Sequence, residues 1–199
     1  MKSIFFSSRT SSRRSSAVLR AVDKDLDGAA KGLGAFFAKP SPETSIEAAA
    51  NLEGVQKRLR AAMASGGDSL GPSATLALER LGSAFGSLRW AIKEVVFWRL
   101  PQDKSHGRTS LLIGESIQRL RRALAAASAD RRETLLLEAR RSARSLIRLL
   151  REGQERLWKG DAPFVQGLQR GEILRLLLEA AAAFDEALEG FLLESEGLR

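Results

Sequence analysis

Five prolines divide this chain of 199 residues into segments that each carry the apolar spacing of an α-helix. They are Pro40, Pro42, Pro72, Pro101 and Pro163. Proline ends or kinks a helix because it lacks an amide proton and its ring clashes with the preceding turn. None of the five interrupts a stretch in which apolar residues recur at steps of three and four, the spacing of an amphipathic helix. The prolines therefore predict where helices begin and end.

The remaining pattern predicts six helices, at about residues 15–38, 42–64, 72–99, 108–127, 131–159 and 164–194. Ser41, followed by Pro42 and Glu43, is a good helix start, and Asp130 and Glu133 have the spacing of a capping box. No segment shows the period-two alternation of a β-strand. Long helices with short connections pack antiparallel. We expect an all-α bundle of six helices, forming one domain over residues 15–199, with two three-helix repeats packed antiparallel.

Composition removes several kinds of chemistry. The chain has no cysteine, which excludes disulfides, zinc–thiolate sites and cysteine nucleophiles. Its single histidine, His106, falls in a stretch expected to be a polar loop, where a catalytic or ligating role has little support. One histidine also excludes the ferritin-like di-iron site, which needs Glu-x-x-His on two helices. No run of 18 apolar residues exists to span a membrane.

The charge is strongly basic, with a formal net charge of +8 at pH 7. No acidic residue precedes Asp23, so residues 1–14 are expected to form a basic, flexible N-terminal arm, with a transit peptide as the alternative. A basic surface suits phosphates, nucleic acid or anionic lipid. We expect a cytoplasmic protein that is able to lie at the periphery of the inner membrane.

Four glutamates, one on each of four expected helices, share a pattern. Residues four apart lie on one helix face, where two carboxylates would present converging oxygens to a hard cation. Here only the first position of each pair is acidic. The pairs are Glu47 and Asn51, Glu79 and Ser83, Glu138 and Ser142, and Glu179 and Ala183. By helical angle all four glutamates lie off the apolar stripe, so the alternative is that they are simply solvated.

The segment LERLGSAFGSLRWAIKEV resembles a helix of PhoU-like phosphate transport regulators, in the branch associated with Pit-type phosphate permeases. The beginning MKSIF, the helix entry SLGPSATLALERLGSAFGSL and the final helix after LWKGDAPFVQG are similar too. The resemblance covers most of residues 43–194 through helix lengths, breaks and the four glutamates. It implies a PhoU-like bundle of two three-helix repeats without catalytic activity.

The resemblance also implies function. Family members carry Glu/Asp-x-x-x-Asp motifs that bind transition or divalent metal ions, which makes Glu47, Glu79, Glu138 and Glu179 the candidate ligands. The second carboxylate of each motif is absent, so we expect no family-type metal cluster and most simply no cofactor. The expected partners are a membrane phosphate permease and a second copy of the chain in a dimer.

Other features leave alternatives open. Arg140, Arg144, Arg148 and Arg151 fall on one helix face beside Arg141, which suits polyphosphate or nucleic acid. The simpler interpretation is a solvated face with intrahelical pairs to Glu138, Glu152 and Glu155. Glu79, Ser83, Gly86 and Trp90 form a second stripe on their helix, explained by helix packing or by a partner groove. Trp90, Trp98 and Trp158 are expected to be packing anchors. A structural dimerising scaffold is the third functional alternative.

Overall fold

The computed structural model describes residues 22, 24–66, 70–100, 104–160 and 163–196. Residues 24–38 are helical, and five longer helices follow: α2 (Pro42–Gly66), α3 (Pro72–Phe97), α4 (Lys104–Ala125), α5 (Ala129–Lys159) and α6 (Phe164–Glu196). No strand occurs in these described ranges. The all-α, six-helix prediction is confirmed. The expected arm at residues 1–14, and residues 15–21 of the first expected helix, lie outside the described residues.

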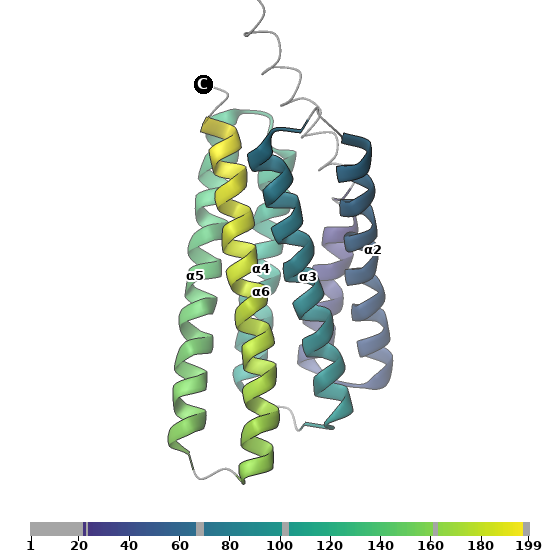
Figure 1. Cartoon of the computed structure of the whole chain (residues 1–199), viewed down its shortest axis with the longest axis vertical. Coiled ribbons are helices and arrows are strands. Elements are labelled where there is room, and N and C mark those ends of the chain that lie inside the picture. The colour runs from purple at the N-terminus through teal and green to yellow at the C-terminus, as the bar shows by residue number, and fades with distance from the viewer. Residues whose placement is uncertain (1–21, 23, 67–69, 101–103, 161–162, 197–199) are drawn as a thin grey trace, which may run out of the picture.

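The helices form an elongated bundle in which each lies alongside its neighbours (Figure 1). α3 packs most extensively against α6, while α5 contacts both α4 and α6, and α2 contacts α3. The segment 24–38 reaches α2, where Asn51 donates a hydrogen bond to the carbonyl of Gly28, and α4, where Gln118 donates one to Asp27. The first three helices and the last three therefore meet along two lines of contact.

The apolar spacing of each helix predicts an inward stripe, and most of its positions are buried. Leu52, Leu81 and Phe85 are fully buried, as are Leu136 and Leu188. Leu157 of α5 and Leu174 of α6, which the spacing also places on the inward stripe, are partly exposed. Burial of these side chains is the main force that holds the helices together.

Two helix starts differ in detail from the sequence prediction. Ser41 caps α2 as expected, because its hydroxyl accepts a hydrogen bond from the amide of Thr44. α5, however, is capped by Ser128, whose side chain accepts from the amide of Arg131, so the expected capping box at Asp130 is wrong. α4 begins at Lys104 instead of 108, which puts the backbone of His106 in the first turn of a helix and not in a loop.

None of the described helices combines the length and the apolar composition needed to cross a bilayer.

Candidate functional site

The four candidate glutamates lie on α2, α3, α5 and α6. Glu47, Glu79 and Glu179 are exposed, and Glu138 is partly buried. Among the described residues, no three acidic or histidine side chains gather closely enough to hold a metal ion.

In two of the four glutamate pairs, the residue at the second position makes a hydrogen bond between helices. Asn51 donates from Nδ2 to the carbonyl of Gly28, 3.2 Å away, and so ties α2 to the first helical segment. Ser142 is buried and accepts a hydrogen bond from the guanidinium of Arg119 on α4, which also donates to the backbone carbonyl of Glu138 at 3.1 Å. A permanent cation therefore already lies at the Glu138–Ser142 position.

Glu179 has a cationic partner as well. Arg175, one turn earlier on α6, donates to Glu179 and to both carboxylate oxygens of Glu172. The hydrogen bond from Arg175 lowers the pKa of Glu172, because it favours the charged carboxylate. With arginines at two of the four positions, the donor set does not fit a cluster of hard cations, which needs several free oxygens. Metal binding by single glutamates stays a prediction.

The arginines on one face of α5, Arg140, Arg144, Arg148 and Arg151, fall into two pairs with different contacts. Arg140 Nε lies 3.1 Å from Asp185 Oδ1 and its Nη2 lies 2.8 Å from Glu189 Oε2, both on α6. Arg144 Nε lies 3.4 Å from the other oxygen of Asp185. Burial lowers the pKa of Arg140, but Glu189 and Asp185 outweigh this and raise it. These two arginines join α5 to α6, so the expected intrahelical pairing with glutamates is wrong for them.

Arg148 and Arg151 have no carboxylate within ion-pairing distance among the described residues. Together with Arg144, Ile147, Glu152 and Glu155 they line a shallow, open depression on α5. The two glutamates place negative charge beside the arginines. The depression is therefore a mixed surface and not a purely cationic one.

The outer face of α3 is the most continuous unpartnered surface of that helix. Its side chains at seven-residue steps, Leu76, Ser83, Trp90 and Phe97, are all exposed. Residues seven apart lie almost in line along a helix. Beside this line, Gln56 of α2 donates to the carbonyl of Gly82 at 2.9 Å and would lie against any side chain added at Gly86. Gly86 thus serves helix packing, whereas Ser83 and Trp90 face away from the bundle. We call Leu76, Ser83, Trp90 and Phe97 the α3 line.

The expectation that the tryptophans anchor the packing is wrong. Trp90 is 55% exposed and holds the ammonium of Lys93 over its ring, and Trp158 is 72% exposed. Trp98 is 40% exposed, with its indole Nε1 donating to Glu94. All three present their rings to the surface of the molecule, where aromatic side chains are available for contact with a partner.

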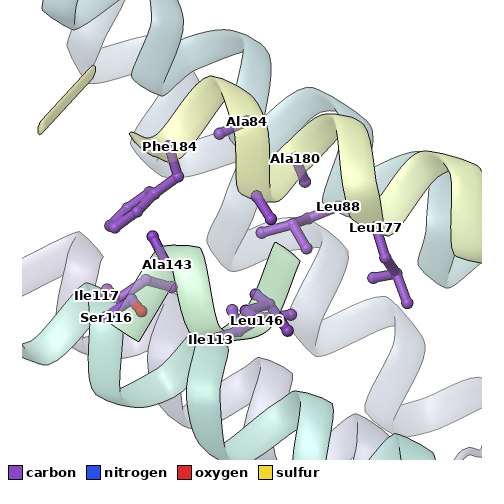
Figure 2. A pocket seen from close by; sticks show the side chains of 11 residues that line it. Ala84, Leu88, Ile113, Ser116, Ile117, Ala143, Leu146, Leu177, Ala180 and Phe184 are labelled. Carbon is purple, nitrogen blue, oxygen red and sulfur yellow. The ribbon is translucent and has the colours of Figure 1, made fainter. Parts of the chain in front are cut away.

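One enclosed space in the described part of the bundle is too small for a substrate. An apolar cavity of about 20 Å³ lies where α3, α4, α5 and α6 meet. Phe184, Ile117 and Leu146 are among the side chains around it (Figure 2). Ser116, which also borders it, already donates to the carbonyl of Leu112 at 2.8 Å. A space of this size holds at most about one water molecule, and only where polar partners are available.

No family model matches the chain, and no curated protein sequence matches it either.

The sequence singles out Ser83 and Trp90 of the α3 line, with a partner groove as one explanation, but the prediction misses Leu76 and Phe97 at the two ends of the line. Leu76, Ser83, Trp90 and Phe97 are spaced seven residues apart in the sequence. The same helix also carries a second apolar stripe, which faces the core. Which of two apolar stripes is covered depends on the neighbouring helices. The signal that could have found it is that α3 carries more apolar residues than one face requires.

Proposed function

We propose that this chain is a non-enzymatic accessory protein that regulates the transport of phosphate or a related inorganic anion by docking on a membrane permease. The observation that carries the docking role is the α3 line, an exposed row that runs the length of one helix. The choice of a phosphate permease rests on the resemblance of residues 43–194 to PhoU-like regulators in sequence.

The α3 line suits a helical partner. Leu76 is 50% exposed and Phe97 is 72% exposed, so the two ends of the line carry apolar area that a partner can bury. At its centre stands Ser83, and a side chain added at the neighbouring Gly82 would meet no atom within 4 Å. A helix that packs along this line would therefore approach closely in the middle and bury apolar contacts at both ends.

The test is binding of the full chain to a purified Pit-type phosphate permease from the same genome. Ser83→Arg puts a long charged side chain in the centre of the α3 line, and we expect affinity to fall by about tenfold or more, which is about 1.4 kcal/mol. Leu137→Arg is the matched control, because Leu137 is 42% exposed on α5 and lies outside the line. Equal binding by both variants, or no binding by the natural chain, would contradict the proposal.

A second copy of the chain is the competing occupant of the α3 line. Sedimentation equilibrium of the natural chain and of Ser83→Arg separates the two. A dimer that Ser83→Arg converts to a monomer, without any permease present, would favour the dimerising scaffold.

Binding of polyphosphate or nucleic acid is the second candidate function, and the unpaired state of Arg148 and Arg151 among the described residues favours it. If binding occurs through these arginines, the logarithm of the binding constant should fall linearly with the logarithm of the salt concentration. Arg148→Ala combined with Arg151→Ala should then reduce the slope. The control is Arg80→Ala, which removes a cation already paired with Glu186 at 2.9 Å. A slope that is unchanged by the double variant would exclude this surface.

Metal would act, in this proposal, only by altering surface charge at the glutamates. Elemental analysis of protein purified without chelator and without an affinity metal tests the point. A native metal site would also raise the melting temperature when the metal is added, by mass action.

A further inference from the structure

The ends of the bundle differ in what they expose. Consecutive helices run in opposite directions, so the start of α2, the end of α3, the end of α5 and the start of α6 all lie at one end (Figure 1). We call this the junction end. It lies opposite the end at which α6 finishes at Glu196.

Exposed apolar side chains concentrate at the junction end. Seven of the eleven large apolar side chains exposed in the described parts of the chain lie there. They are Ile46, Phe97, Trp98, Trp158, Phe164, Val165 and Leu168. Of the other four, Leu76 and Leu193 lie close to helix ends at the opposite end, and Trp90 and Leu137 lie further inside α3 and α5. Scattered exposed apolar residues are ordinary, but a concentration on one end indicates an interaction surface.

The α5–α6 hairpin supplies four of the seven. Near its tip α5 and α6 still contact one another, since a side chain added at Gly171 would lie 3.7 Å from Leu157. Trp158 and Phe164 lie closer to the tip than this contact and are 72% and 78% exposed. Figure 1 shows the hairpin extending past the ends of α3 and α4. The helices that cover it elsewhere therefore do not reach these side chains.

Exposed cations lie at the same end of the bundle as these apolar side chains. They are Lys39, Arg99, Arg156 and Lys159, and Arg108 near the start of α4, which begins at this end too. Arg99 has a left-handed backbone with φ of 48°, at the point where the chain leaves α3.

Two acidic residues at this end accept hydrogen bonds within the fold. Glu94 accepts the indole hydrogen of Trp98, and a hydrogen bond from Ser41 lowers the pKa of Glu43. Glu47 and Glu155 are exposed and oppose the basic charge locally. Among the described residues of this end, the five exposed cations outnumber these four carboxylates by one, so the junction end is weakly complementary to a negative surface.

We propose that the junction end docks directly on a membrane surface that contains anionic lipid. Tryptophan and phenylalanine favour the boundary between headgroups and acyl chains, and lysine and arginine nearby are attracted to anionic headgroups. The seven apolar side chains come from several helix ends at one end of the bundle, where a deformable bilayer can contact more than one of them at once. This inference goes beyond the proposed function because lipid alone suffices and no permease takes part.

Flotation of the full chain with lipid vesicles tests the inference. We expect binding to vesicles of phosphatidylcholine with phosphatidylglycerol, and much weaker binding to phosphatidylcholine alone. Trp158→Ser combined with Phe164→Ser should weaken binding at least about tenfold, because two inserted aromatic side chains are lost. Leu137→Ser combined with Leu193→Ser is the matched control, since both residues are exposed apolar side chains outside the junction end and outside the α3 line. All four substitutions are at exposed positions, and circular dichroism checks that the helices remain.

Quenching of tryptophan fluorescence by brominated lipid shows which end of the bundle faces the membrane. Trp98 and Trp158 lie at the junction end, whereas Trp90 lies on the side of the bundle. We expect the quenching to persist in Trp90→Phe and to disappear when Trp98→Phe and Trp158→Phe are combined.

Three results would overturn the inference. One is binding to anionic vesicles that the junction-end variant retains in full, which would assign binding to charge elsewhere. Another is an equal loss in both double variants. The third is a dimer in solution that the junction-end variant alone dissociates, with no vesicle binding, which would assign this end to a second copy of the chain. Because the vesicles contain no protein, the result stands independently of whether a permease binds the α3 line.

Discussion

Asp185 of α6 holds two arginines of α5 at once. It lies 3.1 Å from Arg140 and 3.4 Å from Arg144, and its side chain is only 17% exposed. Arg140 is 18% exposed, so loss of the Asp185 charge leaves a cation in a mostly dry environment with Glu189 as its remaining ion-pair partner among the described residues. Removing one partner of such a pair costs more than the pair contributes, because the remaining charge stays desolvated.

We therefore expect Asp185→Asn to lower the free energy of unfolding by about 1–3 kcal/mol, measured by urea denaturation. Glu186→Gln is the control on the next residue. Glu186 pairs with Arg80 across α3 and α6, but both side chains are about half exposed, and its loss should cost less than about 1 kcal/mol. Similar losses in the two variants would show that burial of the Asp185 pair contributes nothing.

Asp27 gives the clearest pH dependence at the residue scale. It lies 2.7 Å from Lys31 Nζ, accepts a hydrogen bond from Gln118 at 3.0 Å and lies 2.6 Å from Arg121 Nη1. The hydrogen bond from Lys31, followed by that from Gln118, lowers the pKa of Asp27. A carboxyl whose pKa is lower in the folded state stabilises the fold above its unfolded pKa of about 3.9 and loses that effect as the pH falls through the folded value.

We expect Asp27→Asn to melt at a lower temperature than the natural chain at pH 7, with the difference shrinking as the pH falls below about 4. Melting followed by circular dichroism from neutral to acid pH checks this. Other carboxyls with lowered pKa values, Glu43, Glu53 and Glu172, are common to both proteins and cancel in the difference. A difference that stays constant with pH would mean that Asp27 acts through its shape and not through its charge.

At the scale of helices, Gly190 and Gly54 lie in different surroundings. One lies where two helices pack closely, and at the other only helix propensity matters. A Cβ at Gly190 of α6 would lie 2.9 Å from the Cβ of Ala77 and 3.0 Å from the carbonyl oxygen of Ser73, both on α3. At Gly54 of α2 a Cβ would meet nothing within 4 Å. Gly190 therefore permits the close approach of α3 and α6, and Gly54 has no such role.

Gly190→Ala should destabilise the fold by about 1–3 kcal/mol, because the two helices must move apart. Gly54→Ala should stabilise it by about 0.5–1 kcal/mol, because alanine is the better helix former. Urea denaturation of both variants measures the two signs. A stabilising Gly190→Ala would show that α6 shifts along α3 at little cost.

The helices were predictable because their signals are local. Prolines and apolar steps fix α2, α3 and α6 within a few residues, and Ser41 caps α2 as its sequence indicates. The sequence predicts the start of α4 four residues too late, because His106 lies in a polar stretch that nevertheless forms a helical turn. Polar composition alone does not prevent a helix whose later turns are packed.

The partners of the candidate site residues were not predictable, because they come from distant parts of the chain. Ser142 is held by Arg119, 23 residues away, and Arg140 meets Asp185, 45 residues away. The exposure of Trp158 depends on helix length. The sequence shows that α5 and α6 are long, but only the packing shows that the other described helices do not extend as far as their tip.

At the scale of the whole molecule, the line of contact between α3 and α6 decides how the bundle unfolds. Leu81 and Phe85 of α3, and Leu188 of α6, are buried in one continuous core shared by both halves. Asp27 links the halves again through Arg121. Neither half can unfold without exposing the apolar face of the other, so the cost of separating them is high.

We therefore expect one cooperative unfolding transition for the described bundle, as a single domain requires. The tryptophans allow each half to be followed separately. In a variant with Trp158→Phe, fluorescence reports only α3, through Trp90 and Trp98. With Trp90→Phe and Trp98→Phe combined, it reports only α5. Midpoints in urea that coincide with each other and with the loss of helix by circular dichroism confirm one domain, because the α3–α6 contacts then couple the halves completely. Two separated midpoints would mean that each three-helix half is stable alone, and that the shared core contributes less than the contacts within each half.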